Sequence, residues 1–139
     1  MPTHAKMMDH LAEEGFRPHL EGPDDKGCAT ISFKAEGTLF AVLTEDNDPS
    51  YLHLVVYYQL DRPDQLPASL AVANEMNVRW KAVKSVVDEA AQGVSFHVEV
   101  FLEDPERFGA VLERGLSVLR ATADGFFEAL SERPPQLLA

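Results

Sequence analysis

The sequence predicts an α+β domain: an antiparallel sheet of five to six strands with helices packed on it, the last of them long. Apolar residues recur with a helical period in three segments, and they alternate with a period of two in strand-like segments such as 28–35. The order of these segments is α-β-β-β-β-α-β-β-α, and short turns join neighbouring strands, which is typical of antiparallel pairing. A chain of 139 residues suits a single domain, spanning 1–139.

The segment 3–15 is expected to be a helix that ends at Gly15. Its apolar residues fall on one stripe, which predicts a buried face. These residues are Met7, Met8, Leu11 and Ala12. Residues 16–20 predict a short first strand, which Pro18 confines to an edge of the sheet.

Three long strands are expected over 28–35, 38–44 and 51–58. The first alternates between polar and apolar side chains, which is typical of a strand with one buried face. The third has two unlike faces, one apolar and one that is half polar and aromatic, as in a surface that a partner covers. This second face comprises Tyr51, His53, Val55 and Tyr57.

The second half of the chain predicts a helix over 67–79, strands over 81–88 and 94–102, and a long final helix. Asp104 and Pro105 are a typical helix start, and Pro134-Pro135 ends the pattern. A helix of roughly 28 residues would be roughly 42 Å long. Its glycines each cost around 1 kcal/mol against alanine, so tertiary packing must hold it. They are Gly109, Gly115 and Gly125.

The charge balance narrows the class of partner. Acidic residues outnumber basic ones, 23 to 12, which gives a formal net charge of -11. This disfavours nucleic acid as a partner, because Lys and Arg neutralise its phosphates, and it disfavours anionic membrane surfaces.

The single cysteine, Cys28, has no partner for an intramolecular disulfide. The sequence shows no export signal and no apolar run of about 20 residues, so we expect a cytoplasmic protein.

The stretch Leu66 to Val87 gathers two asparagines and the only tryptophan on a helix that runs into a strand. Asn74 and Asn77 share a helix face with Leu70. They contact a partner or, alternatively, tie the helix to the next strand, because asparagine competes for backbone groups within a helix. Trp80 either anchors an interface or fills the edge of the core. We expect these residues, and those of the second face of the strand 51–58, to form dimer or partner contacts.

The sequence contains no motif for catalysis or for a cofactor. Glycine-rich phosphate loops and the GxSxG nucleophile pattern are absent. His53 and His97 lie on predicted strands and can meet across the sheet, but two histidines alone make a poor metal site. A carboxylate such as Glu99 would need a cleft to act as an acid or a base. We therefore predict a protein that is not an enzyme and that uses no cofactor or metal.

Three segments carry a resemblance to a known family. LAEEGFRP (Leu11 to Pro18) closes the first helix, and ISFKAEG (Ile31 to Gly37) follows it. ANEMNVRWKAVK (Ala73 to Lys84) leads from helix to strand, and VEVFLEDPERF (Val98 to Phe108) leads from strand to helix. In this order they resemble the bacterial YbjN-like family, which is described as a sensory-transduction regulator and shares the fold of type III secretion chaperones. The resemblance implies a homodimer whose surface holds another protein or an extended peptide segment.

We therefore expect a non-enzymatic, dimeric protein-binding domain in a bacterial cytoplasm, either chaperone-like or a regulatory adaptor. Neither nucleic acid nor a membrane is an expected partner. The alternative is a small-molecule-binding sensor or a minor enzyme that uses a pocket between the sheet and the C-terminal helix.

Overall fold

The computed structural model describes residues 3–133, which form one six-stranded antiparallel sheet with three α-helices. The helices are α1 (Thr3–Glu13), α2 (Leu66–Arg79) and α3 (Phe108–Ser131). The strands are β1 (His19–Glu21), β2 (Cys28–Ala35), β3 (Thr38–Glu45), β4 (Tyr51–Gln59), β5 (Lys84–Asp88) and β6 (Gly93–Phe101). The predicted fold class and element order are confirmed.

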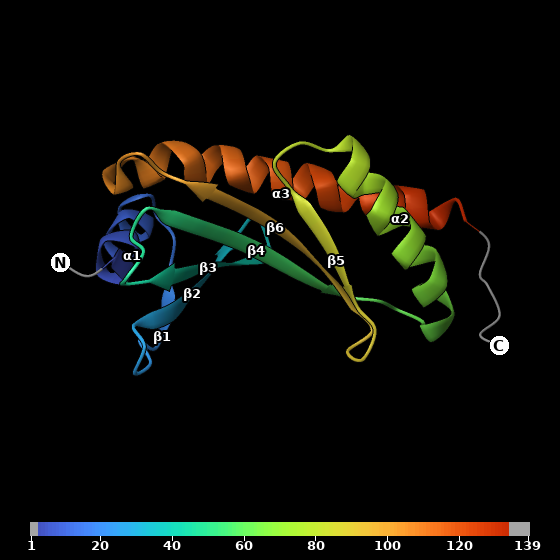
Figure 1. Cartoon of the computed structure of the whole chain (residues 1–139), viewed down its shortest axis with the longest axis horizontal. Helices are drawn as coiled ribbons and strands as arrows, with labels where there is room; N and C mark the ends of the chain where they lie inside the picture. The colour runs from blue at the N-terminus through green and yellow to red at the C-terminus, as the bar shows by residue number, and fades with distance from the viewer. Residues whose placement is uncertain (1–2, 134–139) are drawn as a thin grey trace.

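The strand order in the sheet is β1-β2-β3-β4-β6-β5. The first four strands are neighbours in sequence and in space. After β4, α2 carries the chain to the outer edge, where β5 begins, and β6 then returns between β5 and β4 (Figure 1). Strands β4 and β6 pair along their whole length, from Tyr51 opposite Phe101 to Gln59 opposite Gly93. This pairing places the side chains of the candidate site.

The helices pack on one face of the sheet, and the hydrophobic core lies between the helices and this face. Helix α3 runs along β4 and β6 and contacts both (Figure 1). Its residues Leu119 and Phe126 are fully buried, as are Leu54 and Phe96 of the sheet. The rings of Phe96 and Phe126 meet edge to face, with 5.3 Å between their centroids. Helix α1 covers β2 and β3, and α2 lies beside β5 and α3.

Two boundaries near the middle helix and the first strand differ from the prediction. The strand expected over 81–88 begins at Lys84, because the irregular segment before it contains Ala82 at a positive φ of 64°. The first strand is His19–Glu21 rather than 16–20. It begins directly after Pro18, which has no N–H to donate to a neighbouring strand.

The start of the long helix is tighter than predicted. Residues Pro105–Arg107 form a 3-10 turn, and the regular α-helix begins at Phe108. Asp104 caps this turn, since its carboxylate accepts a hydrogen bond from the Glu106 N–H at 3.0 Å. The helix ends at Ser131, while the predicted stop at Pro134 and Pro135 lies outside the described residues.

The three glycines of α3 sit where other elements approach the helix closely. A Cβ at Gly115 would overlap Leu54 Cδ1 of the buried core, and one at Gly109 would overlap the His10 ring of α1. At Gly125 it would lie 3.0 Å from Trp80 Cζ2. The poor helix propensity of glycine is therefore offset by contacts that a larger residue would prevent.

We predict that Gly115→Ala destabilises the protein although alanine is the better helix former. Overpacking costs about 1–3 kcal/mol, against about 1 kcal/mol gained in helix propensity. Urea unfolding measures the difference, and Ser117→Ala on the exposed side of the same helix is the control, expected within about 0.5 kcal/mol of wild type. A Gly115→Ala protein more stable than wild type would contradict this packing.

Candidate functional site

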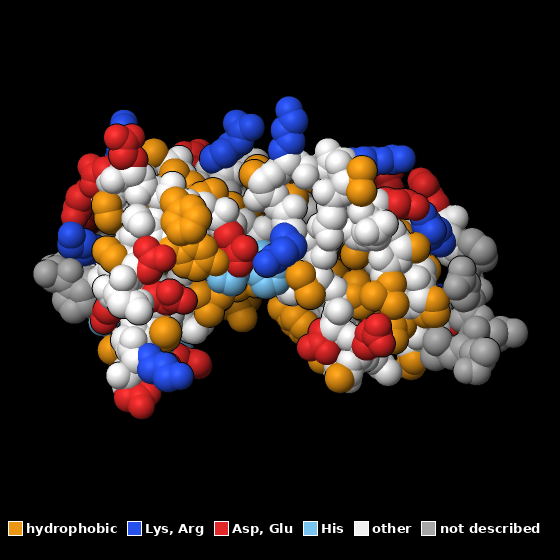
Figure 2. Space-filling view, viewed as in Figure 1, with side chains coloured by type: hydrophobic (Ala, Val, Ile, Leu, Met, Phe, Trp, Pro, Cys, Tyr) orange, Lys and Arg blue, Asp and Glu red, His pale blue; other side chains and the backbone are white. Residues whose placement is uncertain are grey.

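The sheet face that points away from the helices, here called the open face, carries the second face predicted for the strand 51–58. Tyr51, His53, Val55 and Tyr57 all lie on it, because they alternate with the buried residues of β4. The neighbouring strands add Leu39, Ala41 and Leu43 of β3, Ser95, His97, Glu99 and Phe101 of β6, and Lys84 and Val86 of β5. Figure 2 shows a hollow between two lobes, with histidine side chains beside it and hydrophobic side chains on both sides.

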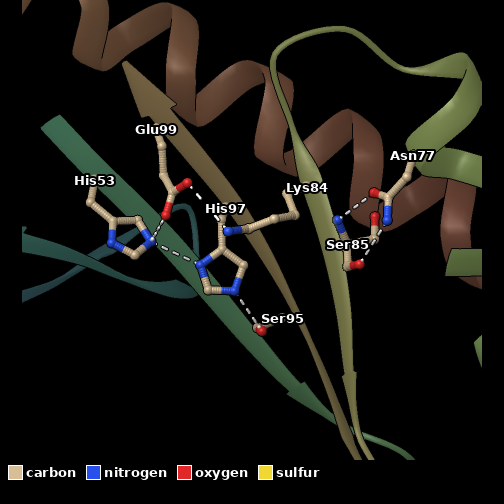
Figure 3. Close-up of polar contacts among 7 residues, drawn as sticks. All are labelled: His53, Asn77, Lys84, Ser85, Ser95, His97 and Glu99. Atoms are coloured by element: carbon tan, nitrogen blue, oxygen red, sulfur yellow. Dashed lines mark hydrogen bonds and ion pairs between the residues drawn. The ribbon is translucent and has the colours of Figure 1, made fainter. Parts of the chain in front are cut away.

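Two histidines meet at the centre of the open face (Figure 3). Nε2 of His53 lies 2.9 Å from Nδ1 of His97, whose Nε2 lies 2.7 Å from the Ser95 hydroxyl. The strand register causes this contact. His53 pairs with Glu99, so His97, two residues earlier on the same face, becomes its diagonal neighbour.

A carboxylate and a lysine complete this polar cluster. One oxygen of Glu99 lies 3.5 Å from Nε2 of His53, and the other lies 3.3 Å from Nζ of Lys84. Lys84 comes from β5, where it pairs with His97 across the strands. The cluster therefore joins the three strands β4, β6 and β5 on one face.

The surroundings keep both imidazoles neutral at pH 7. Burial, followed by the nearby charges of His53 and Lys84, lowers the pKa of His97 to about 4. Burial also lowers the pKa of His53, although the Glu99 carboxylate opposes this effect. Burial disfavours the charge of Glu99 itself, but Tyr51, Lys84 and His53 together outweigh it and lower the pKa of Glu99.

The cluster does not fit a catalytic role at neutral pH. Ser95, His97 and His53 are connected in the order of a nucleophile, a base and a group that orients the base. A general base works best with a pKa near the working pH, and a pKa of about 4 makes His97 a weak base at pH 7. Within residues 3–133, no group of three or more His, Cys, Asp or Glu side chains is placed to hold a metal ion.

Apolar and aromatic side chains surround the cluster and are strongly exposed. Phe101 is 78% exposed, Leu39 56% and Tyr57 49%. Phe101, Tyr51, His53 and His97 form a row of rings whose neighbouring centroids lie 5.6, 6.0 and 5.1 Å apart. Exposed apolar groups that gather on one face, rather than singly, indicate an interaction surface.

Helix α2 presents a second exposed apolar surface. Its buried residues all lie on one side, towards β5 and α3. The opposite side, here called the outer face of α2, carries no charged residue. It comprises Pro67, Leu70, Ala71, Asn74 and Val78. Val78 is 80% exposed and Leu70 41% exposed, which is unusual for one helix face in a protein with this much charge.

The structure separates the four residues that the sequence placed together on this helix. Leu70 and Asn74 lie on the outer face, where a partner can reach them. Asn77 faces β5 instead: its Oδ1 accepts the Ser85 N–H at 2.7 Å and its Nδ2 donates to the Ser85 carbonyl at 3.1 Å. Trp80 is half-buried and packs over Gly125 of α3. For Asn77, the alternative of tying the helix to the next strand describes the geometry.

Sequence reasoning passed over several residues of these surfaces. Val78 was not singled out, although it lies four residues after Asn74 and eight after Leu70 on the same helix face. Phe101 was not singled out either, and Glu99 was considered only as an acid or a base, although both alternate with the buried residues of β6. Only the register of β4 against β6 shows that they adjoin Tyr51 and His53.

A groove of about 880 Å³ lies away from both surfaces, between α1, the β3–β4 turn and the start of α3. Lys6, His10 and Glu106 are among its lining residues. Lys6 and Glu106 form an ion pair of 2.5 Å that links α1 to the start of α3. By contrast, the space between the sheet and the middle of α3 is filled by core side chains.

Comparison with known proteins gives a likeness of fold. No protein-family model and no curated protein matches the chain. An uncharacterized protein from Methanothermobacter thermautotrophicus is similar with a TM-score of 0.61 and 10% identity, over 92% of this chain and 99% of that chain. A chain of the HopA1–SchA chaperone–effector complex is similar with a TM-score of 0.56 and 17% identity, over 90% of this chain and 92% of that chain.

The fold is similar to that of a type III chaperone. The order of the elements and the long C-terminal helix predicted from the sequence agree with this likeness. Within residues 3–133, no helix is long and apolar enough to cross a membrane.

We predict that Asn77→Ala and Asn74→Ala, three residues apart on one helix, have different effects on stability. Asn77→Ala removes both hydrogen bonds to the backbone of the buried Ser85 and should cost about 1–3 kcal/mol. Asn74 lies on the outer face of α2, and its replacement should change stability by about 0.5 kcal/mol or less. Chemical denaturation of the two variants measures this. Equal losses would show that the contact with β5 does not stabilise the domain.

Proposed function

We propose that this protein is a non-enzymatic, homodimeric protein-binding domain, chaperone-like or a regulatory adaptor, in a bacterial cytoplasm. The observation that carries the proposal is the open face. A whole face of the sheet, rich in exposed apolar and aromatic side chains, lies opposite the helices. Its central polar cluster is a weak candidate for chemistry, so contact with another protein is the function that suits it best.

An extended polypeptide segment fits the open face better than a compact partner does. The face repeats with the period of a strand, so an extended segment can place alternate side chains between its rows of residues. Tyr57, which packs against Gly93 and donates a hydrogen bond to Gln59 at 3.2 Å, offers a rigid aromatic contact near one end. The exposed Phe101 lies at the other end of the same strand pair.

The fold comparison supports a protein partner. One similar structure is described as a chaperone–effector complex, in which the partner is another protein. The segments quoted above also resemble the YbjN-like family, and we include membership of that family in the proposal. The net charge of -11 further favours a protein partner over nucleic acid or an anionic membrane.

The outer face of α2 is the proposed dimer seam. Leu70 and Val78 stand four residues to either side of Asn74. Two copies of α2 that cross antiparallel about a two-fold axis at Asn74 would therefore place Leu70 against the partner subunit's Val78. Such a self-complementary pattern is what a symmetric interface requires. With no charged side chain on this face, its burial leaves no unpaired charge.

A small-molecule sensor is the second candidate, and the groove beside α1 is the observation that favours it. A thermal-shift screen against metabolites and metal ions distinguishes the two functions, because a ligand that binds the native state alone raises its stability. A large shift with one compound, lost in Lys6→Ala, would favour the sensor.

We predict that the wild type is a dimer at micromolar concentration and that the double variant Leu70→Asp/Val78→Asp is a folded monomer. Charges introduced at the centre of an apolar interface would be buried without partners. Sedimentation velocity measures the mass, and circular dichroism checks the fold. Leu39→Asp makes the same kind of change on the open face and should leave the dimer intact. A wild-type monomer would rule out this seam.

We predict that partner capture depends on the open face. Immobilised wild type should recover specific proteins from a bacterial lysate, identified by mass spectrometry, and Leu39→Asp/Phe101→Asp should reduce their recovery by about tenfold or more, as loss of aromatic and apolar anchors does. The control is Glu113→Ala on the exposed side of α3. Equal recovery by all three proteins would contradict binding at the open face.

A further inference from the structure

We propose that the His53–His97 pair makes the open face proton-responsive: the pair takes up one proton as the pH falls below neutral, and this proton disfavours a bound apolar segment. The effect on binding rests on the proposed function, whereas the uptake of a proton by the pair does not depend on any partner.

Only one hydrogen atom can occupy the 2.9 Å gap between Nε2 of His53 and Nδ1 of His97. When both rings are neutral, one nitrogen donates and the other accepts. When one ring becomes an imidazolium, it still donates to the neutral ring, so the contact survives. A second proton would place two N–H groups against each other and force the rings apart. The pair therefore holds one charge readily and a second only by breaking its contact.

The neighbouring charges direct the first proton to His53. The Glu99 carboxylate lies 3.5 Å from Nε2 of His53, and Glu45 of β3 also favours its positive charge. Lys84 of β5 opposes protonation of both rings, but it pairs directly with His97. Tyr51, whose pKa burial raises to about 12, contributes no charge. In the singly protonated pair, His97 is therefore the neutral ring that accepts the hydrogen bond from His53. Its other nitrogen, Nε2, lies 2.7 Å from the Ser95 hydroxyl.

A segment that covers the open face would favour the neutral pair. The rings lie at the centre of the face, beside Val55, and are already partly buried. A covering segment removes the remaining water and raises the cost of a charge there. Binding therefore lowers the pKa of the pair. By linkage, binding is strongest above the pKa of the free pair and weakens as the pH falls through it, by at most about tenfold per pH unit for one proton.

The free energy of unfolding depends on pH in the same direction as binding does. Both histidines have lowered pKa values in the folded chain, that of His97 falling from 6.5 to about 4. Their contribution to stability is therefore complete above the unfolded value and is lost as the pH falls from about 6.5 towards about 4. A His97→Gln protein should lose less stability over this range than the wild type does.

The first experiment measures the imidazole nitrogens of the full chain by NMR between pH 8 and pH 3.5. We expect two separate steps for His53 and His97 in the wild type, and a single step for the remaining ring in His53→Gln and in His97→Gln. His19→Gln is the control, since His19 lies on the open face in β1 at a different strand pair. Simultaneous titration of both rings in the wild type, or a His53 titration unchanged by His97→Gln, would overturn the proposal.

The second experiment uses Nile red, an uncharged dye that reports on exposed apolar surface, so any pH dependence belongs to the protein. We expect dye binding by the wild type to fall by more than about twofold between pH 7.5 and the pH at which the NMR titration shows the first proton bound, and by much less in His53→Gln/His97→Gln. Equal pH dependence in the two proteins would overturn the link between the proton and the surface.

The two proposals fail in different ways. If the NMR titration shows two steps but no protein is captured at any pH, the proposed function fails and the proton-binding pair remains. If capture depends on Leu39 and Phe101 but the histidines titrate independently, the binding surface remains and its proton control fails.

Discussion

The packing of α3 against one face of the sheet is the constraint on which the rest of the molecule depends. Leu119 and Phe126 of this helix are buried against the β4–β6 pair, and Gly115 lets the helix approach Leu54 closely. A sheet needs a second layer on at least one face to bury its apolar side chains. Here α1 and α3 supply that layer on one side, which leaves the open face available to another molecule.

Helix α2 packs against β5, the edge strand of the sheet, and at the same time exposes a surface of its own. Asn77 satisfies the backbone of Ser85 at the outer edge of β5, which would otherwise offer its N–H and carbonyl groups to a passing strand. Trp80 and Met76 fix the same helix end over Gly125 of α3. The outer face of α2 is thereby held in a fixed orientation, as a dimer seam needs, and it points away from the core.

The open face combines apolar area with a polar cluster, and the two have different effects. Exposed rings and aliphatic side chains supply contact area that gains free energy when it is covered. A segment that covers the cluster of His53, His97, Glu99 and Lys84 removes water from it, so these groups must then stay hydrogen-bonded to one another. Their mutual contacts meet this requirement, but a proton on the pair adds a charge that is costly once water has been removed. This is why the protonation of the pair matters to the proposed binding.

The sequence by itself determined the fold class, the order of the elements and the two faces of each long strand. Periodicity and turn residues are local properties. Alternation in 28–35, and the contrast between an apolar and a half-polar face in 51–58, indicate which face is buried. It also brought forward Leu70, Asn74, Asn77 and Trp80 as contact residues, but it left open whether the asparagines face a partner or the next strand. Only the tertiary structure separated Asn77, which binds the backbone of β5, from Asn74, which lies on the outer face of α2, because that depends on where β5 lies. The sequence allowed His53 and His97 to meet across the sheet, but only the register of β4 against β6 shows that they do. These residues are 44 positions apart in the chain, and local pattern does not encode the pairing of such distant segments.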